Sequence, residues 1–173
     1  MDAAQLKDKI RSIPDFPIPG ILFRDITPVL QDPAALRAAV DLMADAYRHA
    51  KIDVVVGIEA RGYILGAPIA YKLGAGFVPV RKPGKLPYDK ISVDYALEYG
   101  TNTLEMHSDA VNGTHRVLVV DDLLATGGTA AAVRQMLDRV GGRIVGFAFL
   151  IELTALGGRA KLQGVDVKSF ITY

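Results

Sequence analysis

Two adjacent carboxylates directly precede a glycine-containing loop in the stretch VLVVDDLLATGGT, residues 117–129. Four apolar residues lead into Asp121 and Asp122, and the segment ATGGT, residues 125–129, follows them. Glycines there let backbone N–H groups converge on a ligand, the dipole of a following helix favours an anion, and threonine hydroxyls add donors. The composition therefore predicts a phosphate-binding loop, although it lacks the G-x-x-x-x-G-K-[ST] pattern of a P-loop.

The two carboxylates would repel a phosphate placed beside them, so they predict a different ligand group at that position. Vicinal hydroxyls or a hydrated Mg²⁺ suit carboxylate oxygens. A ribose 5-phosphate meets both needs, with its phosphate in the loop and its hydroxyls towards Asp121 and Asp122. An ordinary strand–turn–helix junction is the alternative for the loop alone. A phosphoacceptor receiver domain shares the acidic pair, but it places the pair nearer its start and leaves the glycines unexplained.

Two further segments combine basic residues with glycine or proline. GIEARGY, residues 57–63, follows an apolar run, and its backbone N–H groups and Arg61 suit a second phosphate. A surface salt bridge of Arg61 is the alternative. RKPGKLPYDK, residues 81–90, is either a solvated basic loop or a lid whose cations stabilise a leaving anion and exclude water.

Short apolar runs rich in β-branched residues alternate with helical patterns along the chain. This order predicts a three-layer α/β fold with a mostly parallel central sheet and helices on both faces. Asp32 and Pro33 are typical of a helix start, Pro68 is expected to kink or delay its helix, and a hairpin is expected around Gly100. The expected strands are 52–58, 76–80, 116–120, 143–153 and 167–173, and the expected helices include 129–140, which Gly141 ends.

Length and composition narrow the classes of protein. A chain of 173 residues suggests one domain, and a net charge of +1 favours neither nucleic acid nor an anionic membrane as partner. The N-terminal segment lacks the apolar core of a signal peptide, and the absence of cysteine fits a reducing compartment, so we expect a cytoplasmic protein. The three histidines are widely separated, which gives no zinc-site pattern.

The stretch VLVVDDLLATGGT resembles the ribose-phosphate-binding motif of type I phosphoribosyltransferases. The form DDLLATGGT is the one found in members that use adenine, and the similarity continues through PDFPIPGILFRDITP, GIEARGY, RKPGKLP and LEYG. The resemblance implies the fold of that family, with a small N-terminal or hood region. It also implies purine salvage from adenine and phosphoribosyl pyrophosphate, giving AMP and pyrophosphate. Mg²⁺, held mainly by the substrate, and a homodimer are further implications.

The resemblance divides the single domain 1–173 into a core, a base-covering arm (1–32) and a mobile lid (81–95). In the arm, Phe23 is expected to stack on adenine while neighbouring peptide groups read the base edge; a loop anchor is the alternative. One C=O and one N–H of the protein can match the 6-amino group and N1 of adenine. A 6-oxopurine reverses this donor–acceptor pattern and leaves two buried protein groups unpaired, which can favour adenine by about 10⁴-fold. Another phosphoribosyltransferase with a different base, or a non-catalytic sensor of the sugar diphosphate, remains open.

The resemblance also assigns the residues of the site. Glu98 is expected to handle the purine proton, Tyr99 to close over the site, and Arg81 to reach the pyrophosphate of a neighbouring subunit. It implies a cis peptide at Glu59–Ala60. The complete expected set is Glu98 and Arg61 for catalysis; Asp121, Asp122, Ala125, Thr126, Gly127, Gly128 and Thr129 for ribose and 5-phosphate; Glu59, Ala60, Arg61, Arg81, Lys82 and Lys85 for pyrophosphate; Leu22, Phe23 and Arg24 for adenine; and Asp121 and Asp122, through water, for Mg²⁺.

Overall fold

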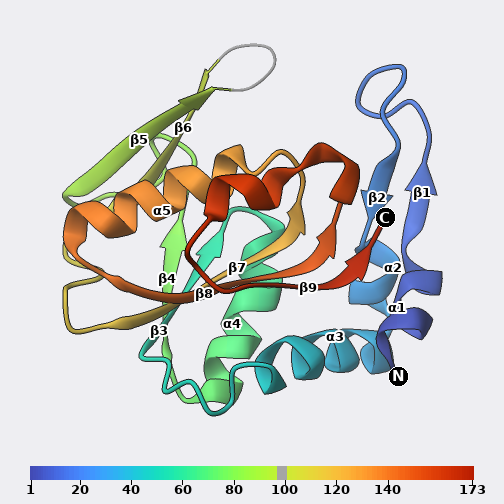
Figure 1. The fold of residues 1–173 in the computed structure, drawn as a ribbon, viewed down its shortest axis with the longest axis horizontal. Helices are drawn as coiled ribbons and strands as arrows, with labels where there is room; N and C mark the ends of the chain where they lie inside the picture. The colour runs from blue at the N-terminus through green and yellow to red at the C-terminus, as the bar shows by residue number, and fades with distance from the viewer. Residues whose placement is uncertain (97–100) are drawn as a thin grey trace.

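Five parallel strands form the central sheet of the computed structural model, which describes residues 1–96 and 101–173 (Figure 1). Their order across the sheet is β4-β3-β7-β8-β9, and each neighbouring pair is parallel. The continuous apolar runs of the sequence form these strands because both faces of the sheet are covered. Their bounds are β3 Val54–Ile58, β4 Gly76–Val80, β7 Arg116–Leu124, β8 Arg143–Glu152 and β9 Val167–Thr172.

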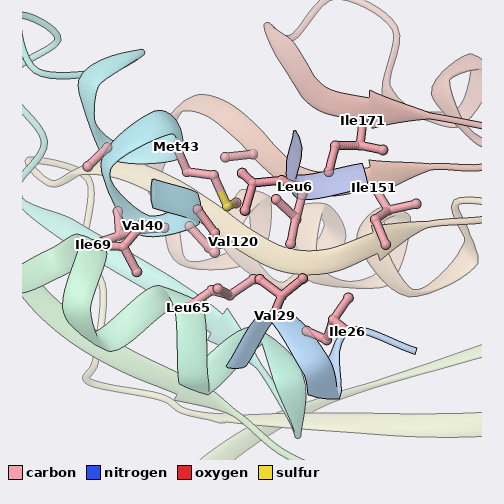
Figure 2. Packing of buried hydrophobic residues seen from close by; sticks show 14 of the residues in the cluster. Leu6, Ile26, Val29, Val40, Met43, Leu65, Ile69, Val120, Ile151 and Ile171 are labelled. Carbon is pink, nitrogen blue, oxygen red and sulfur yellow. The ribbon is translucent and has the colours of Figure 1, made fainter. Parts of the chain in front are cut away.

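Helices cover both faces of this sheet, which confirms the predicted three-layer α/β fold (Figure 1). On one face, Leu6, Met43, Leu65 and Val120 belong to one buried cluster that joins three helices to the sheet (Figure 2). On the other face, Val133 of the last helix packs with strand residues in a second cluster. The helices are α1 Ala3–Lys9, α2 Thr27–Gln31, α3 Pro33–Asp45, α4 Arg61–Leu73 and α5 Gly128–Val140, with short 3₁₀ turns η1 Thr154–Leu156 and η2 Gly158–Leu162.

Two antiparallel hairpins extend from the sheet and its helices (Figure 1). β1, Arg11–Ile13, pairs with β2, Phe23–Asp25, so part of the proline-rich arm is a short ribbon. β5, Lys90–Ala96, pairs with β6, Thr101–His107, which confirms the hairpin that was predicted around Gly100. Arg139 Nη1 donates to the Ser92 carbonyl at 3.0 Å and fastens this second hairpin to α5.

The structure corrects two details of the sequence reading. Pro68 does not delay its helix: α4 runs from Arg61 to Leu73 with Pro68 inside it. Burial of Leu65 and Ile69 holds that helix against the sheet and offsets the hydrogen bond that a proline removes. The predicted caps are confirmed: the Asp32 side chain accepts the first N–H groups of α3, and Gly141 ends α5 in the left-handed conformation.

The second correction concerns the strand before the phosphate loop. The apolar pattern predicted a strand over 116–120, whereas β7 continues to Leu124 and contains both acidic residues. Pairing with β8 extends it, because Asp121 lies opposite Phe149 and Leu124 opposite Glu152. Among the residues that the structure describes, no helix is long and apolar enough to cross a membrane.

Candidate active site

The site forms where β7 extends beyond the last residue that pairs with β3. β3 pairs with β7 only from Val54–Val117 to Gly57–Val120, and its chain then turns away into the 59–61 segment. β7 continues along β8, and at its other edge the backbone of Gly62, at the start of α4, packs against Asp121. The carboxyl ends of parallel strands border ligand sites in α/β sheets, and this end of β7 carries Asp121 and Asp122.

The predicted phosphate loop joins β7 to the N-terminus of α5. Gly127 is the N-cap with φ 77°, and no side chain caps the helix there. The first N–H groups of a helix lack internal partners, so the uncapped first turn offers donors to an anion. The structure thus gives ATGGT both the glycine turn and the helix start that the sequence predicted.

Most of the predicted residues line one pocket of about 390 Å³. The two loops predicted to bind anions come from distant parts of the chain, yet both border this pocket because β3 and β7 are neighbours in the sheet. The predicted residues that line it are Glu59, Ala60, Arg61, Lys82, Asp121, Asp122, Ala125, Thr126, Gly127, Gly128 and Thr129. The peptide bond between Glu59 and Ala60 is cis, as the resemblance implied.

An ion pair links the arginine loop to the acidic pair. Arg61 Nε donates to Asp122 Oδ2 at 2.5 Å, and Asp122 is only 4% exposed. Burial alone would lower the pKa of Arg61, but the carboxylate of Asp122 and then that of Asp121 outweigh it and raise this pKa. Burial and the charge of Asp122 raise the pKa of Asp121 well above its usual range. The guanidinium of Arg61 therefore stays charged in the pocket, whereas ionisation of the Asp121 carboxyl group costs free energy.

The basic loop is fastened to the rim by two carboxylates. Glu59 Oε2 accepts the Lys82 backbone N–H at 3.0 Å and Arg81 Nε at 3.3 Å. The Lys82 N–H and then Arg81 lower the pKa of Glu59, so this carboxylate stays charged. The buried Glu105 accepts the Gly84 N–H at 3.1 Å. Lys82 lines the pocket, whereas the Arg81 side chain lies against Glu59 and the Lys85 carbonyl.

The predicted adenine residues lie beside the pocket rather than in its lining. The Phe23 ring is 5.4 Å from the Arg61 guanidinium and makes an edge contact with Phe16. The Arg24 guanidinium lies over the Tyr173 ring, 3.7 Å away. Leu22 is exposed. The arm therefore borders the anion pocket through the pair of Phe23 and Arg61.

Comparison with known sequences agrees with this geometry. The profile of the phosphoribosyl transferase domain family matches residues 25–172. The adenine phosphoribosyltransferase of Solibacter usitatus is 58% identical, over 97% of both chains. That of Acaryochloris marina is 60% identical, over 97% of this chain and 99% of its own. The chain belongs to the adenine phosphoribosyltransferase family. The family resemblance found in the sequence is therefore confirmed.

Solved adenine phosphoribosyltransferases have the same fold. The enzyme of Thermoanaerobacter pseudethanolicus is 51% identical, covers 99% of both chains and superposes with a TM-score of 0.96. The Giardia lamblia enzyme, solved with 9-deazaadenine, is 38% identical over 100% of this chain and 98% of its own, with a TM-score of 0.95. The Saccharomyces cerevisiae enzyme, solved with adenine and an imino-altritol bisphosphate, is 37% identical over 97% of both chains, with a TM-score of 0.91.

Within this member of the adenine phosphoribosyltransferase family, the pocket also contains residues that the sequence reading missed. Tyr95 lines it from β5, with its hydroxyl 3.4 Å from Thr129 Oγ1, and Leu104 and Phe149 form an apolar wall. Their apolar or aromatic types carry no signal of chemistry in the sequence, and only the pairing of distant strands brings them here. Glu98 and Tyr99, the predicted proton-handling and closing residues, lie outside the described residues.

The acidic pair fits a magnesium ion carried by the substrate. Mg²⁺ prefers oxygen ligands and usually keeps several waters while it binds substrate phosphates. Asp121 and Asp122 place carboxylate oxygens in the pocket beside the phosphate loop. Among residues 1–96 and 101–173 no group of three or more His, Cys, Asp or Glu side chains forms a metal cluster. An ion that arrives with the substrate would meet these two carboxylates in the pocket.

Proposed function

We propose that this pocket transfers the 5-phosphoribosyl group of phosphoribosyl pyrophosphate to adenine, giving AMP and pyrophosphate in purine salvage. The observation that carries the proposal is that the two loops predicted to bind anions and the acidic pair line one pocket of about 390 Å³. A sugar that bears a phosphate at one end and a pyrophosphate at the other needs two such loops, with carboxylates between them for its hydroxyls.

The proposed binding mode follows from the charges. The 5-phosphate accepts N–H groups of the 125–129 loop at the start of α5, where the helix dipole favours an anion. Asp121 and Asp122 accept the ribose hydroxyls, and Arg61 and Lys82 face the pyrophosphate. Mg²⁺ bound to the substrate, with Asp121 and Asp122 reaching it through water, would add positive charge beside the leaving group. Binding energy from the distant phosphate fixes the reacting carbon in place.

The chemical step is a displacement at C1′ through an oxocarbenium-like transition state, comparable to glycoside cleavage. The carboxylates of Asp121 and Asp122 stabilise the positive charge that develops on the ribose ring, and the cations of the pyrophosphate loops stabilise the leaving group. Glu98 handles the proton of the purine, Tyr99 closes over the reacting groups, and the 81–95 segment acts as the lid. Phe23 stacks on adenine, with peptide groups of Leu22 and Arg24 at its edge.

We further propose that the active form is a homodimer. Ile64, Ala67, Pro68 and Tyr71 recur at helical spacing along α4, and Tyr71 is 90% exposed. An exposed apolar stripe on a helix beside the site is typical of an interface between subunits. In such a dimer Arg81, which lies at the rim of the pocket against Glu59, would reach the pyrophosphate of the neighbouring subunit.

The experiment that tests the function supplies the purified protein with phosphoribosyl pyrophosphate, Mg²⁺ and one base at a time: adenine, hypoxanthine, guanine or orotate. Nucleotide formation from adenine alone is expected. Product from another base would keep the phosphate sites but contradict the reading of Phe23 and its neighbours. Binding of phosphoribosyl pyrophosphate without product from any base would instead make the protein a sensor of the sugar diphosphate.

A further inference from the structure

The phosphate loop is supported from behind by a turn that no sequence motif singled out. The turn, Gly157–Arg159, joins η1 to η2 beyond the end of β8. A Cβ atom on Gly158 would lie 2.1 Å from the Ala125 carbonyl oxygen and 2.8 Å from the Gly127 nitrogen. Gly158 is buried, so the backbone of this turn packs directly on the backbone of the loop.

The contact is reciprocal. A Cβ atom on Gly127 would lie 2.4 Å from the Gly158 carbonyl oxygen. Each of the two glycines therefore leaves room for a carbonyl of the other segment, and a methyl group on either would force the segments apart.

An ion pair holds the turn in place. Arg159 Nε donates to Glu152 Oε1 at 3.1 Å and Nη2 donates to Glu152 Oε2 at 2.5 Å, so the guanidinium grips both oxygens of the carboxylate. Glu152 is 6% exposed and ends β8, and the side-chain bonds of Arg159 lower its pKa, which keeps it charged. Arg159 Nη1 also donates to the Val167 carbonyl of β9 at 2.6 Å. The turn is thereby fixed to two strands of the central sheet.

We infer that Gly158, held by the pair of Arg159 and Glu152, positions the phosphate loop for the 5-phosphate of the substrate. The inference rests on the proposed function, because it assigns the 125–129 loop to that phosphate. The loop contains glycines and no side-chain cap, so few interactions within the loop fix the directions of its N–H groups. The Gly157–Arg159 turn behind the loop supports these N–H groups. Arg159 in turn fixes the turn to the central sheet.

Gly158→Ala tests the inference, with Gly157→Ala as its matched control. Gly157 is the neighbouring residue, and nothing lies within 4 Å of a Cβ placed on it; its φ of +63° makes alanine strained there. The control therefore carries backbone strain in the same turn without touching the loop. Loss of stability is expected in both variants, whereas displacement of the phosphate loop is expected only in Gly158→Ala.

Ribose 5-phosphate binding, measured by calorimetry, is the first readout. Gly158→Ala is expected to weaken it about tenfold or more, and to raise the KM for phosphoribosyl pyrophosphate to match, while Gly157→Ala changes both less than about threefold. The KM for adenine at saturating phosphoribosyl pyrophosphate is expected to stay nearly constant. Equal ribose 5-phosphate binding by Gly158→Ala and wild type would overturn the inference. Failure of the wild type to bind ribose 5-phosphate would overturn the proposed function instead.

Arg159→Lys provides a second variant if Gly158→Ala does not fold. Lysine keeps a positive charge beside Glu152 but cannot grip both carboxylate oxygens and the Val167 carbonyl together. Ribose 5-phosphate is expected to bind this variant about threefold to tenfold more weakly, with the adenine KM unchanged. An effect on both substrates in equal measure would show a general loss of structure and would contradict the positioning role.

Discussion

Arg61 and Asp122 form an ion pair across 2.5 Å, while Asp121, the next residue back along β7, accepts the Asp122 backbone N–H at 2.9 Å. The two carboxylates are neighbours in sequence but have different surroundings. Asp122 is buried and neutralised by a cation, and Asp121 faces the pocket with a raised pKa. The two carboxylates that are proposed to meet the ribose therefore have different electrostatic surroundings, and Asp122 also holds Arg61.

Asp122→Asn is expected to lower kcat/KM for phosphoribosyl pyrophosphate about 10²-fold, which corresponds to about 2.7 kcal/mol. The amide keeps the size of the side chain but removes the charge that orients Arg61. Arg61→Gln should have a similar effect. Because the two side chains act as a unit, the double variant is expected to lose little more than the worse single variant. Additive losses in steady-state kinetics would contradict this coupling.

Asp121→Asn is expected to change how stability depends on pH. A raised pKa means that the folded state binds this proton more tightly than the unfolded state does. The contribution of Asp121 to folding stability is therefore fully present at pH values below the ordinary aspartate pKa. It is lost as the pH rises through the raised pKa of the folded state. At neutral pH the variant should be more stable than wild type, although less active. Thermal unfolding from acid to neutral pH measures this, with the exposed Asp109→Asn as control; parallel curves for wild type and Asp121→Asn would refute it.

Glu98→Gln is expected to lower kcat about 10² to 10⁴-fold, the range of general acid–base catalysis, and to change the affinity for phosphoribosyl pyrophosphate far less. The reason is its proposed work on the purine proton, which does not involve the sugar diphosphate. Steady-state kinetics and a separate binding measurement check this. Asp94→Asn in β5 is the control, and equal losses in turnover and binding would count against the role of Glu98.

Tyr95→Phe is expected to raise the KM for phosphoribosyl pyrophosphate about twofold to tenfold, the effect of one hydrogen bond. The Tyr95 hydroxyl lies 3.4 Å from Thr129 Oγ1, and phenylalanine keeps the packing of the ring while it removes this contact. Tyr88→Phe, at an exposed ring in the basic loop, is the control. Unchanged kinetics in Tyr95→Phe would show that the contact does not help to order Thr129 for the phosphate.

Tyr71→Glu combined with Ile64→Glu is expected to convert the proposed homodimer to monomer, because two charges would replace the apolar stripe of α4. Activity should fall as well, since Arg81 would no longer reach a second site. Analytical ultracentrifugation and steady-state kinetics measure the two effects. Leu156→Glu, at an exposed apolar residue elsewhere, is the control. A dimer that survives the double substitution would place the interface on another surface.

The parts of the site that the sequence predicted are those whose signal is local. The 125–129 loop needs only its own glycines and the helix that follows, and both are visible in consecutive residues. β3 is recognisable because a strand buried on both faces is a continuous run of β-branched residues. Family resemblance added the roles of Arg61 and Lys82, which composition alone left open between binding and an ordinary surface position.

The parts that the sequence did not predict depend on distant partners. β7 extends to Leu124 because β8 lies beside it, and no apolar pattern marks that extension. Gly158 supports a loop that is far away in the sequence, and a glycine gives no sign of the carbonyl for which it leaves room. Tyr95 enters the pocket only because the β5–β6 hairpin folds onto α5. Such residues are determined by tertiary contacts rather than by local pattern.

Two different constraints act on the side chains of the single strand β7. From Val117 to Val120 its side chains are buried between the two layers of helices, so exchanges among apolar residues of similar volume are constrained mainly by folding. From Asp121 to Leu124 it borders the pocket, where the chemistry of the substrate adds a second constraint to that of the core, in which Leu124 is buried. The change from one constraint to two falls between Val120 and Asp121, where the pairing of β7 with β3 ends. A change of substrate preference in the last residues of β7 therefore has to preserve the packing of Asp122 and Leu124, which are buried nearly as deeply as the residues before them.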